Sequence, residues 1–390
     1  MSRAMLAARA ALLQAAVGCL LGPGAVSAQS LFAADGLGAL SEPLDARSRA
    51  LGGSGIGMSG AYLLEGDPAA SAAIFIPTAT LSFQTATTTL PGGGTAGHTR
   101  FPAIGASYPF RGSVFSVRAG SFLDQEWETS SEQTIGVGGE QIEVSDSFVS
   151  TGSVARVSLG WARTFFESAA MGVVVGNHTG TTERLFTRQL SPEDVGIGVL
   201  PYEVGGRFRA SGMFVGAGVR WDPVPLVRVA GSLLWSDNLV LSPTDGDVSE
   251  PGRYNVPLEL RGGGTVTLTS GLGLHVGVTY SDWSETGLVD GASRGPTWSY
   301  GAGLEWGGAS FVGKPMPLRV GVRHRDLPFL SSGETASERT YSGGLALDLV
   351  AGEGLSFARL ELGVERGNRE AALISEKFWR TVVSVWVSAG

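Results

Sequence analysis

Apolar and polar residues alternate with a period of two in many segments of the chain after residue 78. In residues 271–280 every second residue is Leu, Val or Tyr, and the residues between them are Gly, His and Thr. Residues 256–268, 298–306, 318–325 and 358–365 follow the same scheme. Because successive side chains of a strand point to opposite faces of a sheet, these segments predict strands with one apolar face and one face of Gly, Arg and Glu.

The alternation predicts about fourteen strands, joined by connections of alternating length. We expect strands at residues 79–89, 99–108, 112–123, 147–165, 169–187, 203–221, 225–241, 254–268, 271–284, 296–306, 316–327, 338–350, 355–366 and 376–388. Short connections at 109–111, 166–168, 222–224, 269–270 and 351–354, with 307–314 as an irregular member, alternate with long ones at 90–98, 124–146, 189–201, 242–253, 286–295, 328–335 and 367–375. Outer-membrane barrels have short turns at one end and longer loops at the other.

Two features favour a membrane barrel over a soluble sandwich, whose strands also alternate. Aromatic residues lie near predicted strand ends, as in interfacial girdles, and the polar faces mix glycine with Arg and Glu, which suits a crowded, wet lumen. In hydrocarbon every backbone polar group must be paired, and only closure removes the free edges of a sheet. The predicted fold class is all-β, a transmembrane antiparallel barrel over residues 79–390.

Composition agrees with this fold and excludes others. The 390 residues include 59 glycines without a collagen period, and only 16% are charged while 43% are hydrophobic. No apolar run of about 18 residues follows the first thirty, which excludes a bundle of membrane helices. The net charge of −8 argues against a nucleic-acid partner, which requires a basic surface.

The amino terminus predicts export. Residues 1–28 combine Arg3 and Arg9, an apolar run at 10–21, and Val-Ser-Ala before Gln29, which together are typical of a cleaved secretory signal peptide. Cys19, the only cysteine, lies inside it; acylation of Cys19 as a lipoprotein is the alternative. With the barrel, the signal peptide predicts the outer membrane of a Gram-negative-type bacterium.

Residues 29–78 do not alternate and are dense in glycine and alanine. Small residues at this density favour a compact plug that packs against the glycine-rich inner wall; a flexible periplasmic lead is the alternative. Asp67 followed by Pro68 predicts a helix start, with Asp67 as the cap and Pro68 in the first helical position.

Two motifs of this segment resemble those of the FadL-type outer-membrane transport proteins. They are "SRALGGSGIGMSGAY" at 48–62 and "GDPAASAAIFIP" at 66–77, and the matching positions are Arg49, Gly52, Gly57, Gly60, Asp67, Pro68 and Pro77. The resemblance implies a hatch inside a fourteen-stranded barrel and inward movement of long-chain fatty acids or aromatic hydrocarbons. This chain departs from the family where Ile76 replaces the usual Asn, and it lacks the terminal aromatic residue. A related subgroup serves protein secretion.

Charged residues on the predicted inner faces are candidate contacts for cargo. They are Arg319, Arg323, Arg359, Arg261 and Glu259. In one interpretation they form ion pairs that hold plug and barrel together. In the other, one or more arginines bind the carboxylate of an amphipathic cargo, since the guanidinium fork matches a carboxylate.

No catalytic, metal or cofactor site is predicted. The four histidines, His98, His178, His275 and His324, have no metal-ligand spacing, and no nucleophile elbow lies in a strand-to-helix context. Residues 124–146 carry seven acidic residues and no Lys or Arg; we expect a solvated loop, with divalent cations that bridge lipopolysaccharide as the alternative.

The predicted function is passive uptake of hydrophobic or amphipathic small molecules by a monomeric, non-enzymatic barrel in contact with membrane lipid and lipopolysaccharide. Capture near the outer loops would be followed by transfer to an apolar pocket and release past a shifted plug. A non-transporting structural or secretion-associated barrel is the alternative, and a general porin is a third interpretation.

Overall fold

The structure is a computed structural model of the chain. It describes residues 30, 38–90, 94–137, 140–190, 200–246, 250–269, 271–286, 295–311, 313–331, 334–352, 355–372 and 374–389. The predicted signal peptide with Cys19, and residues 29 and 31–37 of the predicted plug, lie outside these residues.

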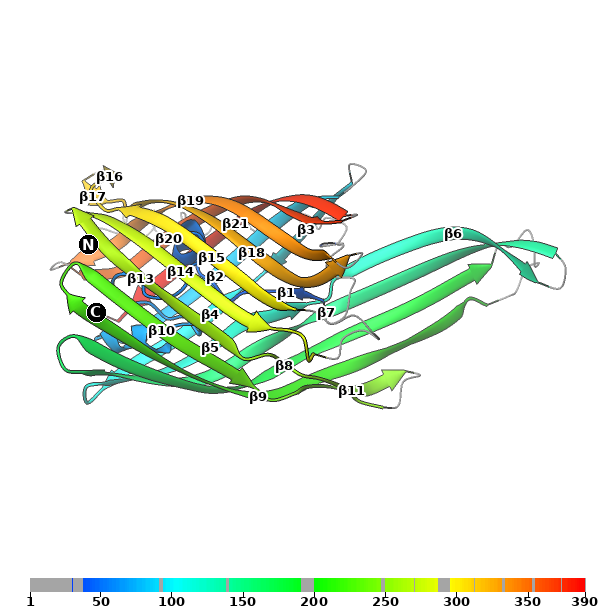
Figure 1. The fold of residues 1–390 in the computed structure, drawn as a ribbon, viewed down its shortest axis with the longest axis horizontal. Coiled ribbons are helices and arrows are strands. Elements are labelled where there is room, and N and C mark those ends of the chain that lie inside the picture. Colours follow the sequence, from blue (N-terminus) through cyan, green and yellow to red (C-terminus); the bar gives the residue numbers. More distant parts are fainter. Residues whose placement is uncertain are drawn as a thin grey trace, which may run out of the picture.

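Fourteen antiparallel strands form the closed wall of a barrel (Figure 1). They are β2 (Thr78–Thr89), β4 (Ala103–Phe110), β5 (Ser113–Asp124), β7 (Glu140–Phe165), β8 (Ala169–Leu190), β9 (Tyr202–Val224), β10 (Val227–Ser236), β13 (Glu259–Thr269), β14 (Leu272–Asp282), β15 (Pro296–Trp306), β18 (Leu318–Ser331), β19 (Glu334–Gly352), β20 (Leu355–Ala371) and β21 (Ile374–Ser388). The last strand, β21, pairs with β2 along the whole of β2 and closes the barrel. The predicted fold class is confirmed.

Seven shorter strands and two short helices complete the described part of the chain. They are β1 (Ala39–Leu40), β3 (Thr95–Arg100), β6 (Trp127–Val137), β11 (Leu239–Gly246), β12 (Gly252–Tyr254), β16 (Ser310–Phe311), β17 (Lys314–Pro315), the α-helix α2 (Ala46–Ala50) and the 3₁₀ helix η2 (Pro68–Ala73). Within the described residues, no helix has the length and apolar character needed to cross a membrane.

The outer face of the wall is apolar. The side chains of Leu159, Val219 and Val320 are 61, 60 and 58% exposed. Exposed aromatic residues lie at both ends of the strands, as Trp298 and Trp306 do in β15. Single exposed apolar residues are common in soluble proteins, but an apolar surface that continues from strand to strand, with aromatic residues at its edges, is typical of a wall in contact with lipid.

Several predicted loops are strands in the structure. Residues 124–146 form the β6–β7 hairpin, in which Trp127 pairs with Ser150 and Val137 with Glu140, and this hairpin extends beyond the rest of the barrel (Figure 1). Likewise β18 continues to Ser331 and β20 to Ala371, into segments that the sequence predicts as long loops. Cross-strand pairing outside the membrane needs no apolar alternation, so hydrophobic periodicity underestimates these strands.

The prediction that the acidic residues of 124–146 are simply solvated is wrong for at least two of them. Asp146 accepts two hydrogen bonds of 2.6 Å from Arg188 of β8, and Asp124 lies 3.1 Å from the guanidinium of Arg100 in β3. The arginines come from other segments, so the absence of Lys and Arg within 124–146 does not reveal the pairing.

Three predicted strands are interrupted. Residues 99–108 divide into β3 and β4 around Phe101 and Pro102, because proline has no N–H to donate to a ladder. Among the described residues β3 pairs with β2, while β5 pairs with β4 only up to Gly120. Beyond Gly120 the N–H of Ser121 donates to the carbonyl of Pro102 at 3.0 Å, and the end of β5 pairs with β1. The segment 225–241 divides into β10 and β11, and 254–268 into β12 and β13.

The interruption between β12 and β13 changes the predicted position of Val256. The sequence predicts Val256 on the same outer face as Leu258 and Leu260. Val256 lies between β12 and β13 and is 4% exposed, whereas Leu258 and Leu260 are exposed on the outside. It belongs to an apolar cluster with Phe122 and residues of neighbouring strands, because alternation does not continue through a segment that leaves the ladder.

Candidate functional site

Residues 38–77, here called the inner segment, run inside the barrel (Figure 1), and the wall meets them with glycine. Seven wall glycines of β13, β14, β15, β18, β19 and β20 face this segment: Gly263, Gly277, Gly301, Gly303, Gly321, Gly344 and Gly363. A Cβ atom on Gly321 would lie 2.3 Å from the backbone nitrogen of Gly52, and one on Gly301 would lie 2.2 Å from its oxygen. We call this set the glycine belt; only glycine permits such close backbone approach.

Two of the three predicted motif glycines are required for two reasons: their backbone has a positive φ, and the wall leaves no room for a Cβ atom. Gly52 has φ +76° and Gly57 has φ +66°, a region that favours glycine, and a Cβ on Gly57 would lie 2.9 Å from the carbonyl carbon of Gly263. Gly60 has φ +75°, but a Cβ there would contact only Arg47, at 3.9 Å. Gly52 and Gly57 therefore fix both the turns of the inner segment and its contact with the wall.

Asp67 joins three parts of the inner segment. One carboxylate oxygen accepts the N–H of Ala70 at 3.2 Å and caps η2. The other accepts the N–H of Gly57 at 2.9 Å and the hydroxyl of Tyr62. Burial, and the nearby Asp67 carboxylate, raise the pKa of Tyr62 well above its ordinary value. Asp67 therefore holds a loop closed as well as starting a helix.

The two motif prolines lie against the wall. A Cβ on Gly172 of β8 would lie 2.4 Å from the carbonyl oxygen of Pro68, and one on Gly218 of β9 would lie 3.0 Å from its Cδ. Pro77 precedes β2, and its carbonyl accepts the N–H of Ala389 at 2.9 Å. The glycine contacts of the inner segment thus continue at η2, on strands that do not contribute to the glycine belt.

Polar side chains of the wall bind the backbone of the inner segment. Six of them donate hydrogen bonds of 2.6–3.2 Å to its carbonyl groups: Arg118 to Leu64, Arg220 to Gly60, Arg228 to Met58, Ser232 to Gly66, Thr265 to Gly57 and Ser342 to Ala50. A carbonyl group left unpaired inside the barrel costs free energy, so these donors stabilise a segment that has little regular structure of its own.

Ion pairs add further links between the inner segment and the wall. Arg47 of α2 binds Glu305 of β15 at 2.8 Å, and Arg156 of β7 donates to Glu65 at 3.2 Å. Burial raises the pKa of Glu65 although Arg156 opposes the shift. Arg156 also lies over the ring of Phe122, 4.0 Å from its centroid.

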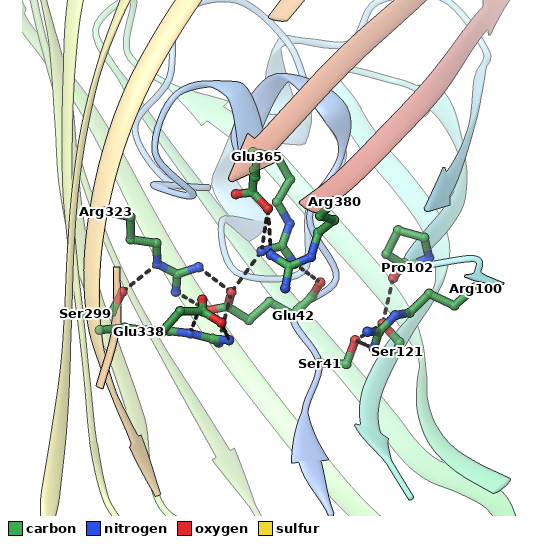
Figure 2. A network of polar contacts seen from close by, with 12 residues as sticks. Ser41, Glu42, Arg100, Pro102, Ser121, Ser299, Arg323, Glu338, Glu365 and Arg380 are labelled. Carbon is green, nitrogen blue, oxygen red and sulfur yellow. Dashed lines mark hydrogen bonds and ion pairs between the residues drawn. The ribbon is translucent and has the colours of Figure 1, made fainter. Parts of the chain in front are cut away.

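Glu42 is the centre of a larger arginine cluster. It accepts hydrogen bonds from both terminal nitrogens of Arg323, and it lies 3.5 Å from Arg325 and 3.4 Å from Arg49. Figure 2 shows Arg323 and Glu42 pointing toward each other, with Glu338 and the Glu365–Arg380 pair close by. Burial alone would raise the pKa of Glu42, but the three arginines hold it well below the ordinary value.

A cavity of about 70 Å³ adjoins this cluster. Its lining combines the charged residues Glu42, Arg323, Arg325, Arg261, Glu259 and Arg156 with the apolar residues Leu40, Phe122, Val256, Trp283 and Leu327. Leu40, Phe122 and Val256 also belong to, or pack against, the apolar cluster between β5, β7, β9 and β11. A second cavity of about 20 Å³ shares Leu40, Ser41, Glu42 and Arg325 with the first. The site is therefore amphipathic.

The structure brings three of the five predicted lumen residues together at this cavity: Arg261, Glu259 and Arg323. Arg319 does not line it and instead bridges Glu305 and Glu361 at 2.6 and 3.1 Å, and Arg359 binds Asp348 at 2.7 Å. Arg261 donates to Glu259 at 2.8 Å and lies where a side chain on Gly66 would be. Each of the four arginines thus has a carboxylate partner.

Of the predicted motif residues, only Arg49 belongs to the Glu42 cluster, through its contacts with the carbonyl and carboxylate of Glu42. Burial lowers the pKa of Arg49 to about 10. Sequence reasoning missed Glu42, Arg325, Arg156 and Phe122. The alternation through 318–325 could have identified Arg325, whereas Glu42 lies in a segment without any period.

Two of the histidines pack against wall residues instead of grouping as metal ligands. His275 is 1% exposed and its Nδ1 is 2.7 Å from the hydroxyl of Thr265, and His178 lies between the rings of Phe122 and Phe214. In the part of the chain that the structure describes, no three His, Cys, Asp or Glu residues are grouped as metal ligands would be.

No family model and no curated protein matches the sequence. Solved structures do match the fold. The Pseudomonas putida toluene transporter TodX is 14% identical with a TM-score of 0.58, and the match covers 91% of this chain and 99% of TodX. The CymD monoaromatic hydrocarbon channel is 12% identical (TM-score 0.57, 87% and 97% covered), and a Pseudomonas aeruginosa FadL homologue is 11% identical (TM-score 0.56, 90% and 99% covered). The fourteen-stranded barrel implied by the sequence resemblance is confirmed.

Proposed function

We propose that this protein is an outer-membrane channel for the passive uptake of hydrophobic or amphipathic small molecules. The observation that carries the proposal is the amphipathic cavity inside a closed barrel whose outer face is apolar. Binding sites for small molecules are mostly apolar concavities with a few placed polar groups. The similar structures, which include a toluene transporter, a monoaromatic hydrocarbon channel and a FadL homologue, support the same class of cargo.

The proposed route begins at the end of the barrel that carries the β6–β7 hairpin. Cargo enters the apolar cluster that contains Phe122 and Val256, and then the adjoining cavity. Release follows displacement of the inner segment, which acts as the plug. The break beside Pro102, where β3 and β5 share no ladder among the described residues and β1 pairs with β5 instead, is a proposed second exit.

The proposal divides the chain as the sequence suggests, into a signal peptide at 1–28, a plug at 29–78 and a barrel at 79–390. The signal peptide directs the chain to the outer membrane of a Gram-negative-type bacterium, where it is a monomer in contact with lipid and lipopolysaccharide. The similar structures named above include a channel and a transporter, and the proposed transport uses no cofactor or energy source.

The test is uptake by cells with and without the protein. The panel contains a labelled medium-chain fatty acid, labelled toluene and labelled glycerol as a water-soluble control. We expect faster uptake of at least one of the first two, with glycerol unchanged. Equal uptake of all three in both strains refutes the transport function. Faster glycerol uptake indicates a general porin, and a co-purifying secreted protein without any uptake indicates a secretion-associated barrel.

A further inference from the structure

Glu42 differs from the other lumen carboxylates that bind arginine because it belongs to the inner segment and also lines the cavity. Its side chain is 21% exposed, while those of its partners Arg323 and Arg325 are 3% and 9% exposed. The guanidinium groups are therefore covered, and the carboxylate that covers them is reachable from the cavity. In the cavity lining, the guanidinium of Arg323 is thus occupied by the chain's own carboxylate.

We infer that Glu42 is an internal substitute for the anionic head of the cargo, and that a cargo carboxylate takes its place on Arg323. This inference rests on the proposed function and specifies which cargo the site selects. Exchange keeps the number of arginine–carboxylate pairs on Arg323 unchanged, so no buried guanidinium loses its partner during the exchange. The released Glu42 still has Arg49, whose guanidinium lies 3.4 Å away.

Exchange also connects cargo binding to the inner segment. Glu42 lies between Leu40, which pairs with Leu123 of β5, and Pro43, whose ring contacts Gly120. Asp45, three residues further on, caps α2 through the N–H of Ser48 at 2.7 Å. Displacement of the Glu42 side chain therefore acts on the backbone that leads directly into α2 and the glycine belt. A neutral molecule has no group to exchange and leaves this contact in place.

The size of the cavity limits the cargo body. A cavity of about 70 Å³ is smaller than the roughly 150 Å³ that holds a benzene ring in a protein core. This cavity therefore fits a short chain, and a longer body must extend past Phe122 and Val256 into the apolar cluster. The ligand class is an amphiphile with a carboxylate at one end and a slender apolar body.

The experiment compares 6-bromohexanoate with 6-bromohexanol, because bromine quenches tryptophan fluorescence and Trp283 lines the cavity. Binding is measured on the purified full chain in nanodiscs, and Trp283→Phe identifies the signal from this site. In Glu42→Gln we expect the carboxylate to bind about tenfold more tightly, since no internal competitor reduces the fraction of free Arg323. Affinity for the alcohol stays within about twofold of wild type.

Glu305→Gln is the matched control, because Glu305 also bridges an inner-segment arginine and a wall arginine but does not line the cavity. Its side chain is 16% exposed, close to that of Glu42. It should leave the ratio of the two affinities unchanged. A thermal midpoint of Glu42→Gln that rises with hexanoate but not with hexanol is also expected, since hexanoate restores the missing partner.

Arg323→Lys is a second test, which can be used if Glu42→Gln does not fold. The substitution keeps the positive charge but removes the guanidinium fork. It should weaken binding of the carboxylate more than that of the alcohol. Equal shifts for both probes in Glu42→Gln, or in Arg323→Lys, overturn the inference while leaving transport intact. Failure of both wild type and Glu42→Gln to bind 6-bromohexanoate likewise overturns the inference, whereas the proposed function itself is rejected only by equal uptake of the fatty acid and of toluene in cells with and without the protein.

Discussion

A single methyl group placed in the glycine belt should loosen the inner segment. In Gly321→Ala the new Cβ would lie 2.3 Å from the nitrogen of Gly52 and 2.7 Å from the carbonyl carbon of Leu51. Both contacts are backbone atoms, so no side-chain rotation relieves them, and an ordinary contact distance of about 3.5 Å requires a movement of about 1 Å. Overpacking of this kind costs about 1–3 kcal/mol.

The wall will not absorb this movement. Gly321 lies in β18, which is paired on both sides, with Gly303 of β15 and Ser342 of β19. The inner segment, by comparison, is held by separate contacts along its length, so it moves first. We therefore expect Gly321→Ala to keep the barrel folded, to lower the free energy of unfolding, and to raise ion conductance through the lumen.

The assay is single-channel conductance in planar bilayers, together with denaturant unfolding of the same preparations. Gly343→Ala is the matched control, because its Cβ would lie 3.7 Å from the nearest atom, the carbonyl oxygen of Arg319. If Gly321→Ala and Gly343→Ala have the same conductance and stability, the glycine belt does not hold the inner segment in place.

Two further predictions concern movement and pH. The Cβ atoms of Ser54→Cys and Gly277→Cys would lie about 3.0 Å apart, near the range for a disulfide. Oxidation of this pair should stop cargo uptake and reduction should restore it, whereas uptake by the single variant Ser54→Cys, which lacks the second thiol, should respond to neither treatment. Full uptake by the oxidised pair would show that this part of the inner segment does not move. Because the folded-state pKa of Glu42 lies below its unfolded value, its contribution to stability is present above about pH 4.5 and is lost as the pH falls through the lower, folded-state pKa. Acid unfolding curves should therefore converge for wild type and Glu42→Gln at low pH, and a constant difference from pH 6 down to complete acid unfolding would contradict this assignment.

Much of the barrel follows from the sequence because the membrane imposes a strict pattern. Lipid outside and a wet lumen inside force the side chains of a strand such as β14 to alternate along its whole length. Outside the membrane the side chains need not alternate, so the sequence no longer predicts the strands there. The β6–β7 hairpin extends beyond the rest of the barrel, and the sequence predicts a loop there. Val256 lies outside the ladder, and the sequence wrongly predicts it on the outer face.

The candidate site is only partly visible in the sequence for a different reason. Arg323 and Arg261 lie on alternating strands, so their inward direction can be predicted. Glu42 lies in a segment without a period, and its partners are more than 280 residues away except Arg49. Alternation assigns a residue to a face but contains no information about which residues meet across a lumen, so Arg319 and Arg359 are predicted together with Arg323 although they bind elsewhere.

The contacts of the inner segment differ in how they respond to cargo. The glycine belt and the wall donors to carbonyl groups involve backbone atoms, and a small molecule cannot replace a backbone in a close-packed contact. The Arg47–Glu305 pair is charged but lies away from the cavity lining. Glu42 combines a replaceable carboxylate with exposure to the cavity, and it lies three residues before Asp45, the cap of α2. It is therefore a contact of the inner segment at which cargo binding and displacement of the plug can be coupled.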